Sequence, residues 1–86
     1  MSTGIIYEGG DGSSMDKAVI IKTSNHAAGV GAEYIWIRNH FPGLRQITQA
    51  LLRGENGEMY DRMECTTPKG ETRVIYFDIT DFFGKK

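Results

Sequence analysis

Residues 46–79 read QITQALLRGENGEMYDRMECTTPKGETRVIYFDI and contain three apolar-rich runs separated by two turn signals. The first signal is Asn56-Gly57, because asparagine and glycine tolerate the two positive φ angles of a type I′ hairpin turn. The second is Thr67-Pro68-Lys69-Gly70, in which proline fixes φ at the first central position of a turn. The stretch therefore predicts an antiparallel meander of three strands, at 46–54, 58–66 and 73–79.

The first of these strands has an alternative interpretation. Leu44, Ile47 and Leu51 stand at positions i, i+3 and i+7, which is the spacing of one face of a helix. A hairpin at Asn56-Gly57 needs a strand on each side. We therefore predict a strand, with a helix over residues 44–53 as the alternative.

The two turns also predict which residues face each other. Two-residue turns place Asp61 opposite Leu52 on one side and opposite Tyr76 on the other, and they pair Glu64 with Arg73, an attraction worth about 0.2–1 kcal/mol. Because side chains alternate across a sheet, we expect one apolar face to pack on a helix: Leu51, Tyr60, Ile75, Phe77 and Ile79. The opposite face then carries Ala50, Leu52, Asp61, Met63, Val74, Tyr76 and Asp78.

The first half of the chain predicts two strands and one helix. The strands cover residues 5–7 and 18–22, and a loop rich in glycine and serine separates them at 9–14. Candidate N-caps at 23–25 precede an amphipathic helix, which Pro42-Gly43 ends. Because Gly29 and Gly31 weaken its first turns, a start nearer Gly31 is the alternative. Its apolar stripe is Val30, Tyr34, Ile37 and Phe41.

These elements give an α+β fold in which one main helix packs on an antiparallel sheet. The order along the chain is β-β-α-β-β-β, and a short helical turn containing Phe82 and Phe83 closes it. We expect residues 1–86 to form a single domain, because 86 residues suffice for one core and no more.

Composition excludes several classes of protein. Apolar residues make up 40% of the chain and charged residues 24%, which argues against disorder. The net charge is −1 and gives no basic excess, which weighs against a nucleic-acid partner. No apolar run approaches the ~20 residues of a membrane span, and the N-terminus lacks the features of a signal peptide. We therefore expect no membrane association and a cytoplasmic location.

The loop Gly10-Asp11-Gly12-Ser13-Ser14 is a candidate anion site. Its backbone N–H groups and hydroxyls could cradle an anion, although the lysine and spacing of a phosphate-binding P-loop are missing. The alternative is a turn in which Asp11 and Ser13 bond the local backbone.

A second candidate is the cluster Asp61, Tyr76 and Asp78, which the predicted register brings together on one sheet face. When two carboxylates lie close together, the pKa of one of them rises, and the pair can then serve as an acid and a base. The alternative is cross-strand hydrogen bonding on a solvated face. Because no third strong ligand stands at a fixed spacing, we expect no metal and no cofactor.

The remaining chemistry-bearing residues favour structural roles. His26 and His40 lie at opposite ends of the predicted helix and cannot share a metal. Cys65 is the only cysteine, so no intramolecular disulfide forms, and no motif around it would activate a thiolate. Trp36 falls off the apolar stripe of the helix, which makes an exposed contact residue of it unless the stripe is broad enough to bury it.

Several segments resemble a family of short bacterial proteins without assigned function. The resemblance is carried by Asp11-Gly12-Ser13-Ser14, Glu33-Tyr34, Tyr60-Asp61 and, most specifically, the Tyr-Phe-Asp-Ile-Thr run and Phe-Phe-Gly-Lys of residues 76–85. It implies a small free-standing bacterial protein and supplies no catalytic residues.

Two functions follow as expectations. The first is a non-catalytic module for a protein partner or for self-association, through a sheet edge or the Trp36 side of the helix. The alternative is a small ligand-binding protein or enzyme that uses the Asp61–Tyr76–Asp78 face. The first is favoured because no catalytic pattern reaches the strength of a motif.

Overall fold

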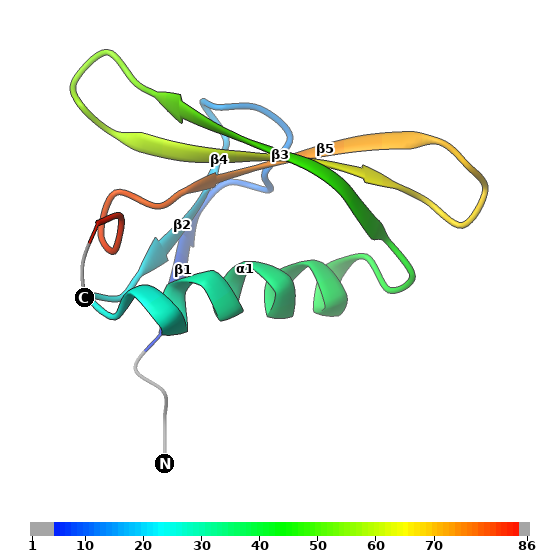
Figure 1. Cartoon of the computed structure of the whole chain (residues 1–86), viewed down its shortest axis with the longest axis horizontal. Coiled ribbons are helices and arrows are strands. Elements are labelled where there is room, and N and C mark those ends of the chain that lie inside the picture. Colours follow the sequence, from blue (N-terminus) through cyan, green and yellow to red (C-terminus); the bar gives the residue numbers. More distant parts are fainter. Residues whose placement is uncertain (1–4, 85–86) are drawn as a thin grey trace.

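The computed structural model describes residues 5–84 and shows one helix lying across a five-stranded sheet (Figure 1). This confirms the α+β class with one helix, and residues 44–53 contribute a strand rather than the alternative helix. The elements are β1 (Ile6–Gly9), β2 (Val19–Lys22), α1 (His26–His40), β3 (Arg45–Arg53), β4 (Met59–Thr66) and β5 (Thr72–Asp78).

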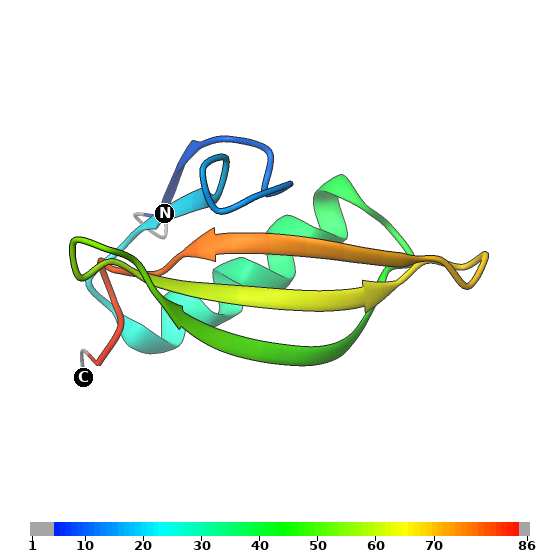
Figure 2. The same cartoon turned by 90° about the horizontal axis from the view of Figure 1, so that it is seen from above.

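The strands lie in the order β1-β2-β5-β4-β3 (Figure 2). The pair β2–β5 is parallel and the other three pairs are antiparallel. The prediction of a wholly antiparallel sheet is therefore wrong at one pair. The physical reason is the connection: the chain leaves β2, crosses one face of the sheet as α1, and returns through β3 and β4 to place β5 beside β2, and a parallel pair needs such a long crossover.

The helix begins directly after the predicted caps, at His26 rather than nearer Gly31, and ends before the predicted stop at Pro42-Gly43. The side-chain oxygen of Asn25 accepts a hydrogen bond from the backbone N–H of Ala28 at 2.8 Å, which makes Asn25 the N-cap. The chain turns away after His40, and Gly43 takes a φ of +87° that favours glycine. Within residues 5–84 no helix combines the length and the apolarity that a membrane crossing requires.

The buried face of α1 differs from the predicted stripe. Of the four predicted positions only Ile37 is fully buried, whereas Val30 and Tyr34 are exposed. The buried residues of the helix are instead Gly29, Ala32, Glu33, Trp36 and Ile37. The buried face includes the small residues Gly29 and Ala32 because they allow the helix to approach its neighbours closely. A prediction based on large apolar side chains alone does not identify them.

Gly29 shows this close approach most clearly. The predicted turn at the end of the chain forms, with the N–H of Phe83 donating to the carbonyl of Ile79 at 2.9 Å, and it buries Phe82 almost completely. The Phe82 ring packs directly on the helix backbone. A Cβ added at Gly29 would lie 2.4 Å from atoms of that ring.

Both hairpin turns are one residue longer than predicted. The carbonyl of Glu58 accepts from the N–H of Gly54 at 2.8 Å, and Gly57 has a φ of +87°. The second hairpin repeats this geometry with Gly70 at +85°. No non-glycine residue among the described residues has a positive φ, so Asn56 does not take the type I′ conformation. Each loop has three residues and ends in a left-handed glycine, a common hairpin alternative.

This extra residue on each side of β4 turns that strand over relative to the prediction. Asp61 pairs with Leu51 and Phe77, instead of Leu52 and Tyr76. A slip of one residue moves side chains to the opposite face. Leu51 and Phe77 therefore stay on the predicted helix-facing side, whereas Asp61 joins them there and Tyr60 leaves it.

The predicted pair of Glu64 and Arg73 is wrong for the same reason. Glu64 lies opposite Val74, and Arg73 lies opposite Cys65. Arg73 instead places its guanidinium 4.7 Å from the centre of the Phe41 ring, and Glu64 pairs with Arg62 of its own strand at 3.6 Å.

We expect Gly29→Ala to destabilise the chain by about 1–3 kcal/mol, because the added methyl collides with the Phe82 ring. Gly31→Ala is the matched control on the same helix, since nothing lies within 4 Å of its added Cβ. That variant should gain up to about 1 kcal/mol from helix propensity. Urea unfolding of both variants measures the difference, and equal effects would contradict the packing.

Candidate functional site

The register of β4 brings two carboxyl groups together beneath the helix. Glu33 lies in the middle of α1 and is 1% exposed, and Asp61 on β4 is 5% exposed. The two side chains share a hydrogen bond. Gln49 of β3 donates its amide Nε2–H to Oδ2 of Asp61 at 2.8 Å. The cluster therefore ties α1, β4 and β3 to one another.

The electrostatics of this cluster fix where its proton lies. Burial raises the pKa of Glu33 from 4.5 to about 10, and the hydrogen bond with Asp61 and the charge of Asp61 add to the rise. Glu33 is therefore a neutral acid at pH 7 that donates to the Asp61 carboxylate. The Oε2 atom of Glu33 has no partner among the described residues.

The cluster holds one buried proton, on Glu33, next to Asp61. Among residues 5–84 no group of three His, Cys, Asp or Glu side chains could hold a metal ion. Both carboxyl groups are closed off from solvent, so a substrate would have to displace the helix to reach them. We therefore infer that Glu33 and Asp61 stabilise the fold.

The proton on Glu33 makes stability depend on pH. Its pKa is about 10 in the folded chain against 4.5 without the fold, so its contribution is complete below about pH 4.5 and is lost as the pH rises toward 10. We expect this group to lower the free energy of unfolding by about 1.4 kcal/mol per pH unit through the neutral range. Glu33→Gln keeps the side chain neutral and should remove this slope in urea unfolding.

Glu71→Gln is the control for that experiment, because Glu71 is an exposed glutamate at the turn before β5. It should keep the slope of the unchanged chain. A Glu33→Gln variant with an unaltered slope would show that Glu33 is ionised in the folded state.

The predicted cluster of Asp61, Tyr76 and Asp78 does not form. Asp61 faces the helix, whereas Tyr76 and Asp78 lie on the opposite face of the sheet because of the slip described above. Tyr76 accepts a hydrogen bond from Nε–H of Arg62 at 3.3 Å. Asp78 accepts from the N–H and the hydroxyl of Thr80 at 3.0 and 2.6 Å.

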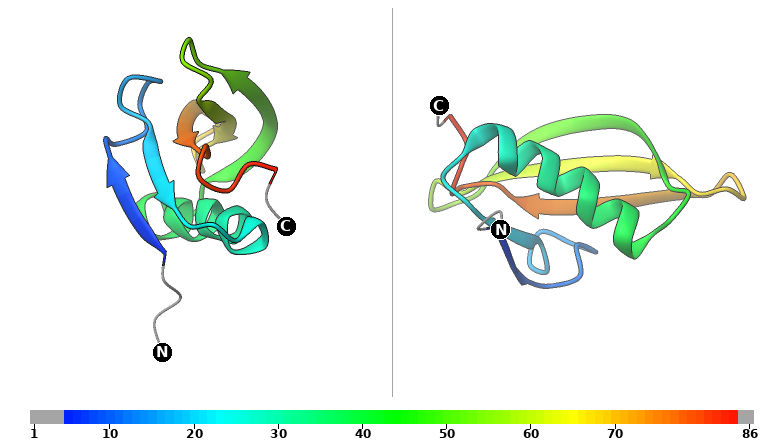
Figure 3. Two further views of the ribbon diagram at one scale, coloured as in Figure 1. Left: turned by 90° about the vertical axis from the view of Figure 1, so that its left-hand side faces the viewer. Right: turned by 90° about the horizontal axis from the view of Figure 1, so that it is seen from below.

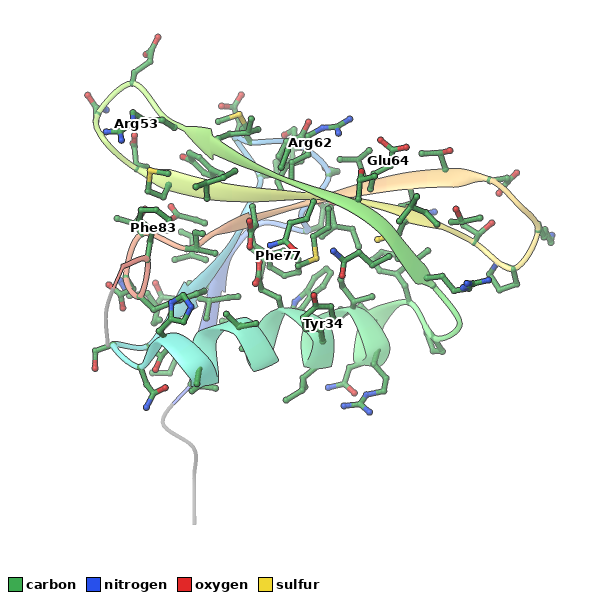
Figure 4. All side chains as sticks on the ribbon, viewed as in Figure 1. Tyr34, Arg53, Arg62, Glu64, Phe77 and Phe83 are labelled. Carbon is green, nitrogen blue, oxygen red and sulfur yellow. The ribbon has the colours of Figure 1, made fainter. Side chains whose placement is uncertain are left out.

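Figure 4 makes this separation visible. The side chains of Arg62 and Glu64 project away from the helix, whereas Phe77 points into the space between sheet and helix. The outer face thus holds polar groups that pair with one another. Of the three residues predicted to form a cluster there, Tyr76 and Asp78 lie on this face, whereas Asp61 lies on the helix side.

The loop at Asp11 uses its hydrogen-bond donors internally. Oδ1 of Asp11 accepts from the N–H of Ser13 at 3.0 Å and from its hydroxyl at 2.6 Å. These bonds hold the pKa of the Asp11 carboxyl below its usual value. The loop therefore presents a carboxylate where the anion site needed free donors, and it supports the turn alternative.

Trp36 is buried, so the expectation of an exposed contact residue is wrong. It is 6% exposed, its ring meets Phe77 edge-on at 5.6 Å, and His40 stacks on it at 4.0 Å. The cause is that the helix turns a different face to the sheet than the predicted stripe. The Trp36 edge still contributes to a cavity of about 400 Å³ between β1 and the end of α1, together with Tyr7 and Phe41.

The histidines and the cysteine take structural positions. His26 lies edge-on to Phe82 at 5.9 Å, and Nδ1 of His40 lies 3.0 Å from the carbonyl oxygen of Trp36. Cys65 is fully buried, and burial raises the pKa of its thiol. The thiol is therefore protonated and unreactive.

The feature that sequence reasoning missed is the outer edge of β3. This strand ends the sheet order, so within the described residues it pairs only with β4. Ile47 and Leu51 are 55% and 52% exposed there. Figure 3 shows the helix crossing the sheet obliquely, with β3 forming the outer rim. One feature of the sequence pointed to this edge: β3 is the first strand of the meander, so the hairpins give it a neighbour on one side alone.

Two further features shape this edge. A register irregularity between Gln46 and Thr48 breaks the ladder at Ile47, so continuous pairing runs from Thr48 to Arg53. Next to the start of the strand, a groove of about 250 Å³ separates it from α1 and is lined by Tyr34, Arg38 and Gln46 among others. We name this hollow the α1–β3 groove.

Comparison of the chain with protein-family models, with curated proteins and with solved structures finds no match in any of the three. The resemblance to short bacterial proteins therefore stays an expectation that rests on the segments quoted above. The function is inferred from the geometry of this chain.

Proposed function

We propose that this protein is a non-catalytic interaction module that binds an extended segment of another polypeptide along the outer edge of β3. The observation that carries the proposal is the nine-residue edge strand with two exposed aliphatic side chains. An unpaired edge offers a row of backbone N–H and C=O groups to an incoming strand. The exposed side chains add apolar contact on top of those bonds.

The length of the open edge suits this role. The continuous part, Thr48–Arg53, spans roughly 20 Å at about 3.3 Å per residue. The bulge at Ile47 interrupts the other part, as bulges do at edges that must not pair indiscriminately. Continuous backbone pairing is thereby limited to one stretch of fixed register, which favours a specific partner over open-ended aggregation.

The other edge of the sheet is less suited. β1 has four residues, fewer than half of the nine in β3. Its side chain Ile6 is 57% exposed, similar to Leu51. The two edges thus differ in length far more than in exposed apolar surface, and this makes Ile6 a natural control.

Selection from a random library of displayed peptides tests the proposal. We expect enriched peptides to shift the backbone amide signals of β3 and to slow hydrogen exchange along Thr48–Arg53. Leu51→Lys should weaken their binding about tenfold or more, since a buried apolar contact is replaced by a charge. Ile6→Lys, equally exposed on the opposite edge, should leave the affinity unchanged.

Other outcomes would overturn the proposal. If the enriched peptides shift the amides of β1 or of the outer sheet face instead, the edge of β3 is not the binding site. The same holds if Leu51→Lys and Ile6→Lys weaken binding equally, because the effect would then come from net charge alone.

A further inference from the structure

The charges of the chain are distributed unevenly around β3. Residues 34–54, which span the second half of α1 and all of β3, contain three of the ten basic residues and none of the eleven acidic ones. This stretch therefore carries +3, whereas the rest of the chain, with seven basic and eleven acidic residues, carries −4. The fold places the three basic residues of this stretch around one rim of the sheet.

The three arginines are Arg38, Arg45 and Arg53, and all are exposed. Arg45 and Arg53 stand at the two ends of β3, and Arg38 lines the α1–β3 groove. Among residues 5–84 the ion pairs are Lys22–Asp81 and Arg62–Glu64. None of the three arginines therefore forms an ion pair within 4.0 Å with a described carboxylate.

We propose that the partner of β3 is an extended protein segment with acidic side chains at its ends and apolar side chains between them. This inference rests on the proposed function of the edge. The acidic ends meet Arg45 and Arg53, and the apolar centre covers Leu51 and Ile47. Complementary charge of this kind sets the register of a strand and its choice of partner.

A second copy of the chain fits the same edge less well. A second β3 would bring another Arg45 and another Arg53 to the same edge. Because β3 contains no Asp or Glu, no register within the strand offers these arginines a carboxylate. A second copy therefore adds like charge to an edge that an acidic segment would complement, so the acidic segment is the better occupant.

The α1–β3 groove adds a place for one side chain of that segment. A strand paired beside β3 points alternate side chains toward the helix side of the sheet. Those near Gln46 would lie over the groove, whose lining includes Tyr34 and Arg38. An aromatic or long aliphatic side chain fills such a hollow, with an acidic neighbour within reach of Arg38.

Three synthetic peptides test this inference. Each has nine residues, the length of β3, and alternates valine and threonine at its centre, with glutamate, glutamine or lysine at both ends. We expect the glutamate peptide to bind about tenfold more tightly than the lysine peptide, with shifts at β3 amides. The gap should shrink as salt is added, since exposed charges are screened.

Charge reversal in the chain supplies the control. Arg45→Glu combined with Arg53→Glu should reverse the order of the peptides. Lys17→Glu combined with Lys22→Glu changes net charge equally on the β2 side and should preserve the order. All four side chains are exposed, so the amide spectrum should confirm an unchanged fold for both variants.

The remaining outcomes separate the two proposals. Equal binding of all three peptides at β3 overturns the acidic partner and leaves the interaction module standing. Binding of none of them at β3, together with failure of the library selection, overturns both. A dimer in sedimentation that protects β3 amides points to a second copy instead, and a single-stranded oligonucleotide that displaces the glutamate peptide points to a nucleic acid. Either result overturns the acidic partner.

Discussion

Each turn that flanks β4 ends in a glycine with a positive φ, and this constraint decides which side chains of the strand meet the helix. Gly57 and Gly70 close loops of three residues, not two. Because each turn has one extra residue, β3 and β5 keep the predicted side chains on the helix side of the sheet. Only β4 presents the opposite set of its side chains to the helix. Asp61 is carried to the buried side, where α1 presents Glu33.

The meeting of these two acids explains why the cluster is built as it is. Two buried carboxylates would repel each other at great cost, so one of them keeps its proton and becomes a donor. Gln49 then supplies a second donor to Asp61 from β3, a strand that within residues 5–84 pairs with β4 alone. The edge strand therefore gains a side-chain bond into the core at the middle of its length, although its outer edge stays open.

The sequence was sufficient to predict where the strands and the helix lie along the chain, but not which of their side chains face the core. Turn residues and apolar runs predict every strand of the meander, and Asn25 and Pro42 bracket the helix because caps and breakers act locally. The prediction of the buried helix face was wrong because Gly29 and Glu33 are buried by contacts with residues distant in sequence. Gly29 packs against Phe82, and Glu33 packs against Asp61. The parallel pairing of β2 with β5 likewise depends on how the two halves dock, which no local pattern encodes.

The candidate binding edge illustrates the same limit from the functional side. Ile47 and Leu51 look like core residues in the sequence, because their spacing is apolar and regular. They are exposed since β3 has a neighbour on one side and the oblique helix does not cover it. Arg45 and Arg53 look scattered until the strand sets them at its two ends. The property that suggests a partner, an open ladder with charge at both ends, thus exists only once the sheet order is known. The proposal of a binding edge therefore rests on this order and on no single motif.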